Sequence, residues 1–489
     1  MVYRFSGRFA LTTPGVKMLR AMLMVPFPLS SLMALAFLLT YVPASSALPS
    51  FSHSYILTTR QQPGAGDADL TVLPNGKMFF CEAAGSYVQD PQAYQVTDGP
   101  ATACLGTLSE NQSREKPSAA FLQHLEDDLK LTVGETKTAL LVLYVHGLSV
   151  SFPEAIPLAA QFGLHFQGQH PDNNNIGTTE CTQNPLPKDC ILCPQDARKA
   201  LFPGLLISFD WPSFDVEGQS ILDQLLTLEF ALAPQTLRDT RQRATDSAPA
   251  FANVIEHVLV PLRQRLESTG VRLQITVIAH SEGNYMLTQG AQAAAQRGLK
   301  RIFKDVILLA ADISSAALNP GKGGEAIFNI GEKVTTYYST SDPELPISSY
   351  LWADLHDPQF NARLGVAGPY SKFSQVTGID ASQATNRIRP AITDLSISDF
   401  ISCASPQSSD NPTSPVIVGL LSQHGAYRCV AETLDDLTMT MMDGVQEFPG
   451  ANRRLRVPKV PNRFSLQVDN NPPLFSCTDW KNSGLGSSD

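Results

Sequence analysis

The chain of 489 residues is long enough to bury a large core, and its length predicts two or three domain-sized units. Hydrophobic residues make up 43% and charged residues 17% of the sequence, which is typical of a globular protein. The formal net charge of −10 argues against a nucleic-acid-binding protein, because such proteins usually carry a basic face.

Residues 1–47 have the pattern of a signal peptide. A segment with basic residues precedes an apolar stretch over 21–42, and Ser45 and Ala47 supply the small residues expected before a signal-peptidase site. The apolar stretch is also about long enough to span a membrane, so an uncleaved N-terminal anchor is the alternative. Both interpretations place the body of the protein outside the cytoplasm, in the periplasm, in the cell envelope or secreted.

The cysteine pattern agrees with export. All eight cysteines follow the proposed cleavage point: Cys81, Cys104, Cys181, Cys190, Cys193, Cys403, Cys429 and Cys477. An even number in an exported chain predicts disulfide bonds, for which Cys81 with Cys104 and Cys403 with Cys429 are local candidates. The Cys190-x-x-Cys193 pair lacks the further ligands of a tetrahedral zinc site, so no metal site is assigned.

Residues 48–135 follow the signal segment and contain short β-like pieces, such as SYILTT and LTVLPNGKMFF, separated by turn residues. No chemical motif is present among them. We expect an N-terminal extension that is β-rich or mixed.

From about residue 136, apolar runs typical of buried strands alternate with helical patterns. The expected strands cover 138–147, 204–213, 271–280, 305–313, 333–342 and 391–398, and the expected helices cover 151–162, 251–267 and 284–298. Gly298 is the expected end of the last helix. Strands that alternate with helices predict a doubly wound α/β domain over 136–447, whose mostly parallel sheet carries helices on both faces.

Polar segments interrupt and follow this domain. Two stretches, at about 167–200 and 402–415, are predicted to be surface insertions. Residues 448–489 are predicted to form a C-terminal tail, with a basic run from Arg453 to Arg463. We interpret that run as solvated, with contact to a membrane or an anionic partner as the alternative.

The segment ITVIAHSEGNY has the pattern of a nucleophile elbow around Ser281. Ala279 and Gly283 are small residues two positions before and after the serine, as the tight strand-to-helix turn of an α/β hydrolase requires. The N-terminus of the following helix adds partial positive charge near the oxyanion that forms during attack. The alternative is a serine that only caps the helix.

An oxyanion hole on this fold takes two backbone N–H groups. One belongs to the residue after the nucleophile, which is Glu282, and the other to the loop after an earlier strand. Leu148, which follows His146 and Gly147, is the candidate for the second donor. His146 precedes the serine, whereas this fold uses the order serine, acid, histidine, so we interpret His146 as a structural residue.

The candidate general base is His424, because it follows the last expected strand, whereas its rival His356 precedes that strand. The candidate acid is Asp342, at the carboxyl end of an expected strand, where α/β sheets place their reactive groups. Asp312 ends the preceding strand and is the alternative acid.

The segments YVHGLSVSFPEA, ISFDWPS, IAHSEGN, LLAADI, YYSTSDPEL and QHGAY together resemble a family of α/β hydrolases catalogued as a domain of unknown function. The resemblance spans about residues 140 to 440 and keeps the order of all six motifs. It implies the α/β-hydrolase fold, with Ser281, Asp342 and His424 in the triad positions. It also places Asp312 on the family's other recurring aspartate, near the site.

Two features depart from the family's pattern. Glu282 replaces the methionine that usually follows the nucleophile, which would place a carboxylate at the mouth of the site. That carboxylate would disfavour anionic substrates or raise the pKa of the histidine, unless it points outward without a role. The loop before His424 is also longer than usual.

The sequence therefore predicts an exported serine hydrolase that cleaves an ester through an acyl-enzyme, as an esterase or lipase does. The expected partner is a small-molecule or lipid acyl ester, with membrane association through 21–42 in the anchored alternative; no nucleic acid, metal or organic cofactor is expected. A serine peptidase or amidase, and a catalytically silent binding protein of the cell envelope, are the alternatives. The sequence leaves the acyl group, the disulfide pairing and the oligomeric state open.

Overall fold

The structure is a computed structural model, and the residues that it describes fall within Pro49–Asp489. The described residues are 53–62, 70–84, 113–133, 136–148, 150, 155, 202–213, 233–342, 344–351, 362–369, 375–385, 424–425, 427, 430–443, 454–458, 460 and 462–467.

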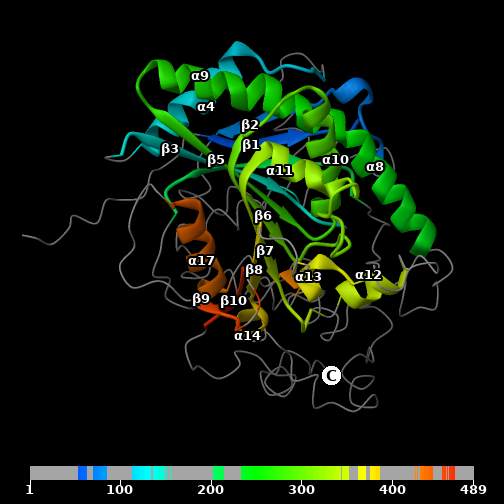
Figure 1. Ribbon diagram of the computed structural model, residues 1–489. Coiled ribbons are helices and arrows are strands. Elements are labelled where there is room, and N and C mark those ends of the chain that lie inside the picture. Colours follow the sequence, from blue (N-terminus) through cyan, green and yellow to red (C-terminus); the bar gives the residue numbers. More distant parts are fainter. Residues whose placement is uncertain are drawn as a thin grey trace, which may run out of the picture. The chain divides into compact units, whose positions relative to one another are not determined.

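A mixed sheet of ten strands, with the order β2-β1-β4-β3-β5-β6-β7-β8-β10-β9, organises the described residues (Figure 1). The strands are β1 (His53–Thr58), β2 (Phe79–Ala84), β3 (Thr138–Val145), β4 (Leu205–Asp210), β5 (Arg272–His280), β6 (Phe303–Leu309), β7 (Gly331–Tyr338), β8 (Val376–Asp380), β9 (Arg454–Arg456) and β10 (Arg463–Leu466). The eight strands between the two edges of the sheet all pair in parallel with one another. The two edge strands, β2 and β9, run antiparallel to their neighbours β1 and β10.

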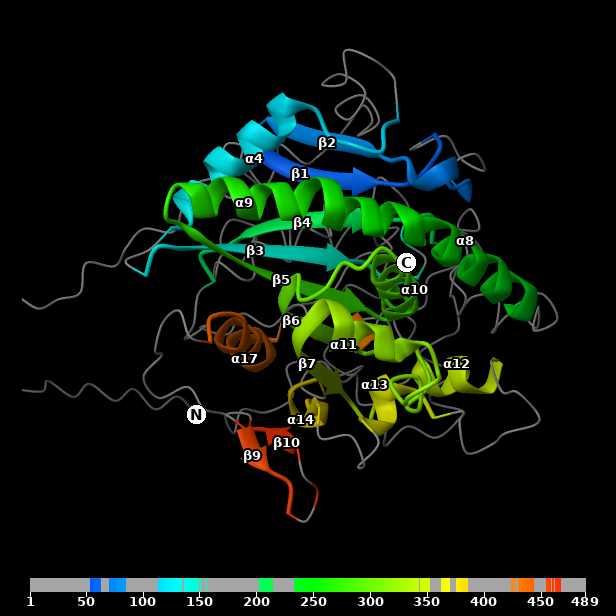
Figure 2. The ribbon, with the colours of Figure 1, turned by 45° about the horizontal axis from the view of Figure 1, so that its top comes forward.

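Helices cover both faces of the sheet (Figures 1 and 2). One face carries α4 (Ala119–Leu131), α8 (Ala233–Val254), α9 (Val260–Ser268), α10 (Gly283–Gln296) and α11 (Ile327–Ile330), and the other carries α17 (Ala431–Met441). A π-helical turn, Ile255–Leu259, joins α8 to α9. The short helices α12 (Leu345–Leu351), α13 (Leu364–Ala367) and α14 (Ser382–Thr385) connect later strands.

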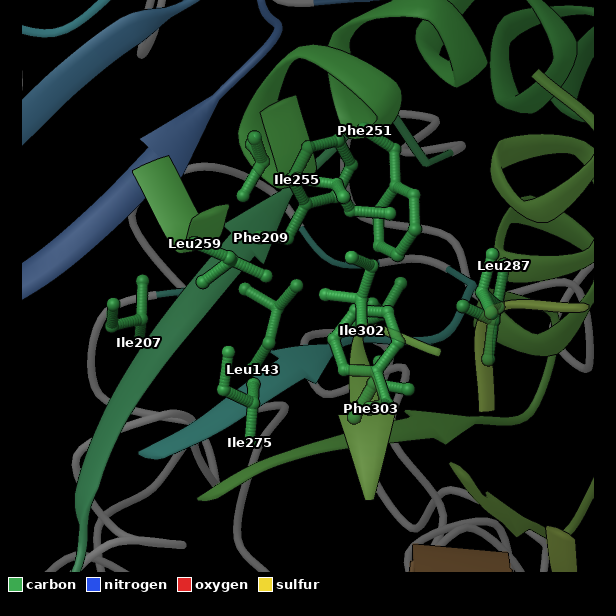
Figure 3. Packing of buried hydrophobic residues seen from close by; sticks show 14 of the residues in the cluster. Leu143, Ile207, Phe209, Phe251, Ile255, Leu259, Ile275, Leu287, Ile302 and Phe303 are labelled. Atoms are coloured by element: carbon green, nitrogen blue, oxygen red, sulfur yellow. The ribbon is translucent and has the colours of Figure 1, made fainter. Parts of the chain in front are cut away.

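The larger core lies between the sheet and the α8, α9 and α10 face (Figure 3). Phe251 of α8 packs edge-to-face on Phe209 of β4, with ring centroids 5.5 Å apart, and also contacts Phe303 of β6. Gly290 lets α10 pass close to α8, because a Cβ at this position would lie 2.5 Å from the Phe251 ring. Close packing of this kind fixes α10, and therefore the turn that precedes it, against the sheet.

The N-terminal segment is part of this sheet. The sequence predicts an extension over 48–135, and in the structure β1 pairs in parallel with β4 while β2 closes that edge. Helix α4, which no sequence pattern predicted, packs under the same edge, where Phe121 contacts Tyr55 and Phe80. Residues on both sides of the predicted boundary near residue 136 therefore belong to the same sheet.

The opposite edge is formed by residues that were predicted to be a tail. Strand β10 pairs in parallel with β8, and β9 pairs with β10. Arg454 forms an ion pair with Asp436 of α17 at 2.8 Å, and Arg463 donates to the backbone carbonyl of Ala367 at 3.0 Å. The interpretation of these two arginines as solvated is wrong, because Arg454 ties the edge strand β9 to α17 and Arg463 ties its neighbour β10 to the end of α13 and the segment after it.

Five of the six strands predicted within 136–447 are confirmed as β3 to β7, and the helix predicted over 284–298 is confirmed as α10. Gly298 follows its end with a φ of 75°, a left-handed conformation that favours glycine. The expected strand 391–398 and almost all of the expected helix 151–162 lie outside the described residues, as do the surface insertions 167–200 and 402–415.

The features predicted for export fall mostly outside the described residues. Among those residues, which exclude 21–42, no helix combines the length and apolar character needed to cross a membrane. Cys81, on β2, is disulfide-bonded. The other cysteines are not described, so their predicted pairing stays a prediction, as does the absence of a zinc site at Cys190 and Cys193.

Candidate active site

Ser281 occupies the turn between β5 and α10, where the order of the sheet reverses. The chain passes from β3 to β4 on one side of β3 and returns to β5 on the other, and such switch points are where α/β sheets bind ligands. The φ angle of Ser281 is 54°, a left-handed conformation that is strained for a non-glycine residue. An elbow of this shape lifts the serine side chain above the end of the sheet.

The neighbouring backbone leaves no room for larger residues at this turn. A Cβ at Gly283 would lie 2.3 Å from the carbonyl oxygen of His146. A Cβ at Gly147 would lie 2.9 Å from the Cβ of Ser281, so the loop after β3 lies directly against the serine. Leu148, the candidate oxyanion donor, is the next residue in that loop and is half-buried.

His424 and Asp342 are brought together from positions 82 residues apart in the sequence. His424 Nδ1 lies 2.7 Å from Asp342 Oδ2, and both side chains are buried. Asp342 Oδ1 accepts the backbone N–H groups of Glu344 and Leu345, which fixes the orientation of the carboxylate. His424 Nε2 has no hydrogen-bond partner in the described part of the chain.

Two further side chains act on His424. The ring of His280, the residue before the serine, lies 4.9 Å from the His424 ring, and its Nε2 donates to the His424 carbonyl at 3.2 Å. Glu344 Oε2 lies 3.7 Å from His424 Nε2. Burial lowers the pKa of His424, but the carboxylates of Asp342 and Glu344 outweigh burial and raise it to about 9.

The model of one protein family, described as alpha/beta hydrolase of unknown function (DUF900), matches residues 122–386. The match covers more than half of the chain. The chain belongs to this family. The predicted resemblance and the predicted α/β-hydrolase fold are thereby confirmed. No curated protein and no solved structure matches the chain.

The family match includes Ser281 and Asp342 and ends before His424. It also includes Asp312, the alternative acid, whose surroundings differ from those of Asp342. Asp312 accepts hydrogen bonds from the Ser348 hydroxyl at 2.6 and 2.7 Å and forms an ion pair with Arg363 at 2.9 Å. Burial raises the pKa of Asp312, but Arg363 and Arg241 outweigh it and lower the pKa. Asp312 is therefore an ionised partner of two arginines.

Glu282, which the sequence resemblance suggested as a departure from the family's pattern, forms a buried ion pair. The sequence places this carboxylate at the mouth of the site, but the side chain is only 1% exposed and lies 2.7 Å from Arg241 Nε of α8. Burial raises the pKa of Glu282 to about 8, although Arg241 lowers it. The expectation of a carboxylate at the mouth is wrong, because α8 supplies a cation that draws the side chain inward. The backbone N–H of Glu282 keeps its predicted position after the serine.

Sequence reasoning missed the residues that surround the predicted ones. Arg241 also donates to the backbone carbonyl of Asp312 and lies over the Tyr285 ring, 4.5 Å from its centroid. No motif marks this arginine, because its partners come from other elements. His146 lies 2.9 Å from Asp210 of β4, a contact that agrees with its interpretation as a structural residue. The rival base His356 lies outside the described residues.

Proposed function

We propose that the protein is a serine hydrolase that cleaves a carboxylic ester, with Ser281 as nucleophile, His424 as base and Asp342 as the acid that orients the base. The observation that carries this proposal is the buried 2.7 Å contact between His424 and Asp342, combined with a serine in a left-handed elbow on the same end of the sheet. The three residues follow the chain order of α/β hydrolases.

In the proposed reaction, Ser281 Oγ attacks the ester carbonyl carbon while its proton moves to His424 Nε2. The carbonyl π electrons move to the oxygen, which accepts the N–H groups of Glu282 and Leu148. The tetrahedral intermediate collapses as the bond to the alcohol oxygen breaks, and the alcohol takes the proton from His424. Water then attacks the acyl-serine with His424 again as base, which releases the acid and restores Ser281.

The proposed substrate is a small-molecule or lipid acyl ester, and the proposed location is the periplasm, the cell envelope or the exterior. A membrane anchor at 21–42 is the alternative to secretion. A serine peptidase or amidase would use the same groups, because the triad does not distinguish an ester from an amide carbonyl. A silent binding protein is disfavoured, because a buried histidine that is paired with an aspartate and packs on His280, the residue before a strained serine, has no evident structural purpose.

A fluorophosphonate probe tests the proposal directly. We expect the full-length protein to be labelled and the Ser281→Ala variant to be unlabelled, with an ester panel of increasing acyl length hydrolysed by the wild type only. Peptide and amide substrates measured beside the esters separate the esterase from the peptidase alternative. A folded wild-type protein that is not labelled would contradict the proposal, and labelling that persists in Ser281→Ala would show that a different serine is the nucleophile.

The pH profile of the same activity is expected to report the surroundings of His424. A base works only when neutral, so kcat/KM should rise with pH through the His424 pKa of about 9. Glu344→Gln removes one carboxylate that raises this pKa, so the rise should move to lower pH by roughly one unit. The control is Glu332→Gln, which changes an exposed glutamate paired with Lys304. An unchanged profile in Glu344→Gln would rule out this electrostatic contact.

A further inference from the structure

The loop that carries the proposed oxyanion donor is held from outside by the N-terminal edge of the sheet. This loop, residues 146–150, of which the structure describes 146–148 and 150, leaves β3 and contains Leu148. It lies beside β4, and β1 lies on the far side of β4. Arg60 follows the end of β1, and its side chain is fully buried. Arg60 contacts both the end of β4 and the loop that lies against Ser281.

Arg60 joins the end of β4 to the far end of this loop. Its Nε lies 2.9 Å from Asp210 Oδ2, and its Nη2 donates to Asp210 Oδ1 at 3.0 Å. The same Nη2 donates to the backbone carbonyl of Val150 at 2.6 Å and to that of Trp211 at 3.1 Å. One planar guanidinium therefore fixes the carboxylate and two backbone carbonyls at once.

Asp210 holds the near end of the loop. Its Oδ1 lies 2.9 Å from His146 Nε2, and the Trp211 indole N–H donates to the His146 carbonyl at 3.0 Å. The rings of His146 and Trp211 are nearly parallel, with centroids 5.9 Å apart. Burial raises the pKa of Asp210, but Arg60 and His146 outweigh it and lower the pKa to about 2, so the carboxylate stays ionised.

Ser213 completes the hold on Val150. The Val150 N–H donates to Ser213 Oγ at 2.9 Å, and Ser213 Oγ donates to the Val150 carbonyl, also at 2.9 Å. The loop is thus bound at its first residue by Asp210 and at its last residue by Arg60 and Ser213. Between these two points Gly147 lies against Ser281, so a shift of the loop would move the adjacent Leu148 N–H relative to the nucleophile.

A stabilising role alone explains this arrangement poorly. Arg60 and Asp210 are both fully buried, and removing two charges from water costs about as much as their attraction returns. Apolar side chains would fill the space without that cost. The geometry of the ion pair, with its additional bonds to backbone carbonyls, is better suited to fixing a loop than to adding free energy of unfolding.

We propose that Arg60 and Ser213 are positioning residues, which hold the 146–150 loop so that the Leu148 N–H can stabilise the oxyanion formed at Ser281. This inference rests on the proposed serine hydrolase function. It assigns a role to a segment outside the family match, because Arg60 precedes residue 122, where the match begins. The N-terminal edge of the sheet is then part of the catalytic apparatus.

The test measures transition-state stabilisation separately from substrate binding. Arg60→Lys keeps the charge but lacks the planar set of donors, and Ser213→Ala removes the second hold on Val150. Loss of an oxyanion donor typically costs about 10²–10³-fold in kcat, so a displaced donor should cost about tenfold. We expect kcat to fall about tenfold in each variant with KM nearly unchanged. The affinity for a trifluoromethyl ketone, which forms a tetrahedral adduct with serine, should fall by the same factor.

Arg454→Lys is the matched control, because Arg454 is also a largely buried, paired arginine but contacts α17 and β7. We expect it to change the Tm without changing kcat. The proposal is overturned if Arg60→Lys and Ser213→Ala fold and keep wild-type kcat, or if all three variants lose activity in proportion to their loss of Tm. If Arg60→Lys does not fold, the result for Ser213→Ala decides. A wild-type protein that the fluorophosphonate does not label would instead reject the proposed function itself.

Discussion

Asp342→Asn is expected to lower kcat for ester hydrolysis by about 10⁴-fold at neutral pH while leaving the protein folded. The substitution keeps Oδ1, which accepts the N–H groups of Glu344 and Leu345, and replaces Oδ2 by an NH₂ group. That group would donate to His424 Nδ1, which forces the proton of the neutral ring onto Nε2. Nε2 could then no longer accept the proton of Ser281.

The matched control for this prediction is Asp312→Asn, because Asp312 is the rival acid and is equally buried. Its carboxylate binds Arg363 and Ser348, so the substitution should lower the midpoint of urea unfolding and change kcat by less than about tenfold. Steady-state kinetics and urea unfolding on both variants distinguish the two aspartates. A large loss of kcat in Asp312→Asn together with near-normal kcat in Asp342→Asn would show that Asp312, and not Asp342, is the acid of the triad.

The parts of the site that the sequence predicted are those set by local chemistry. An apolar strand, a serine between small residues and a helix stand next to one another in the chain, so the elbow at Ser281 could be predicted from eleven consecutive residues. His424 and Asp342 lie far apart in the sequence, but the order of triad residues on this fold limited the choice to a few candidates. In the structure the two side chains lie 2.7 Å apart, as expected of a base and the acid that would orient it, and their catalytic roles stay a proposal.

The residues that the sequence did not predict obtain their roles from pairing between distant segments. Arg60 directly follows the short β-like piece SYILTT, and nothing near it in the chain indicates that β1 lies beside β4. The residues of strand β10 were predicted to belong to a solvated tail because the segment is basic, and their place in the sheet depends on pairing with β8. Periodicity reports which residues face a core, but it does not report which strands are neighbours.

Glu282 illustrates the same limit at the centre of the site. From the sequence, a carboxylate after the nucleophile could be judged only by its own charge, which suggested an exposed position. The structure adds Arg241, 41 residues earlier, whose side chain reaches Glu282 and the carbonyl of Asp312. A methionine at this position, which the sequence resemblance led us to expect, would need no such cation. Glu282 and Arg241 therefore form a pair in which the charge of each compensates the cost of burying the other.

Arg241→Met is accordingly expected to reduce the free energy of unfolding by about 3–5 kcal/mol at pH 9, where it leaves an ionised Glu282 carboxylate buried without its partner. The measurement is urea unfolding of the full-length protein at several pH values. The pKa of Glu282 is about 8 with Arg241 in place and should be higher without it, because Arg241 lowers this pKa, so at pH 6 the carboxyl is largely protonated with or without the arginine. The cost of Arg241→Met should therefore be larger at pH 9 than at pH 6.

The double variant Glu282→Met with Arg241→Met tests whether the two residues stabilise the protein as a pair or independently of each other. Removing both charges leaves an uncharged methionine after Ser281 and leaves Asp312 paired with Arg363, so most of the lost stability should return. A coupling free energy of about 2 kcal/mol or more between the two substitutions would establish the pair. Additive losses, or a cost of Arg241→Met that does not change with pH, would show that Arg241 stabilises the elbow through its contacts with Tyr285 and Asp312 and not through the charge of Glu282.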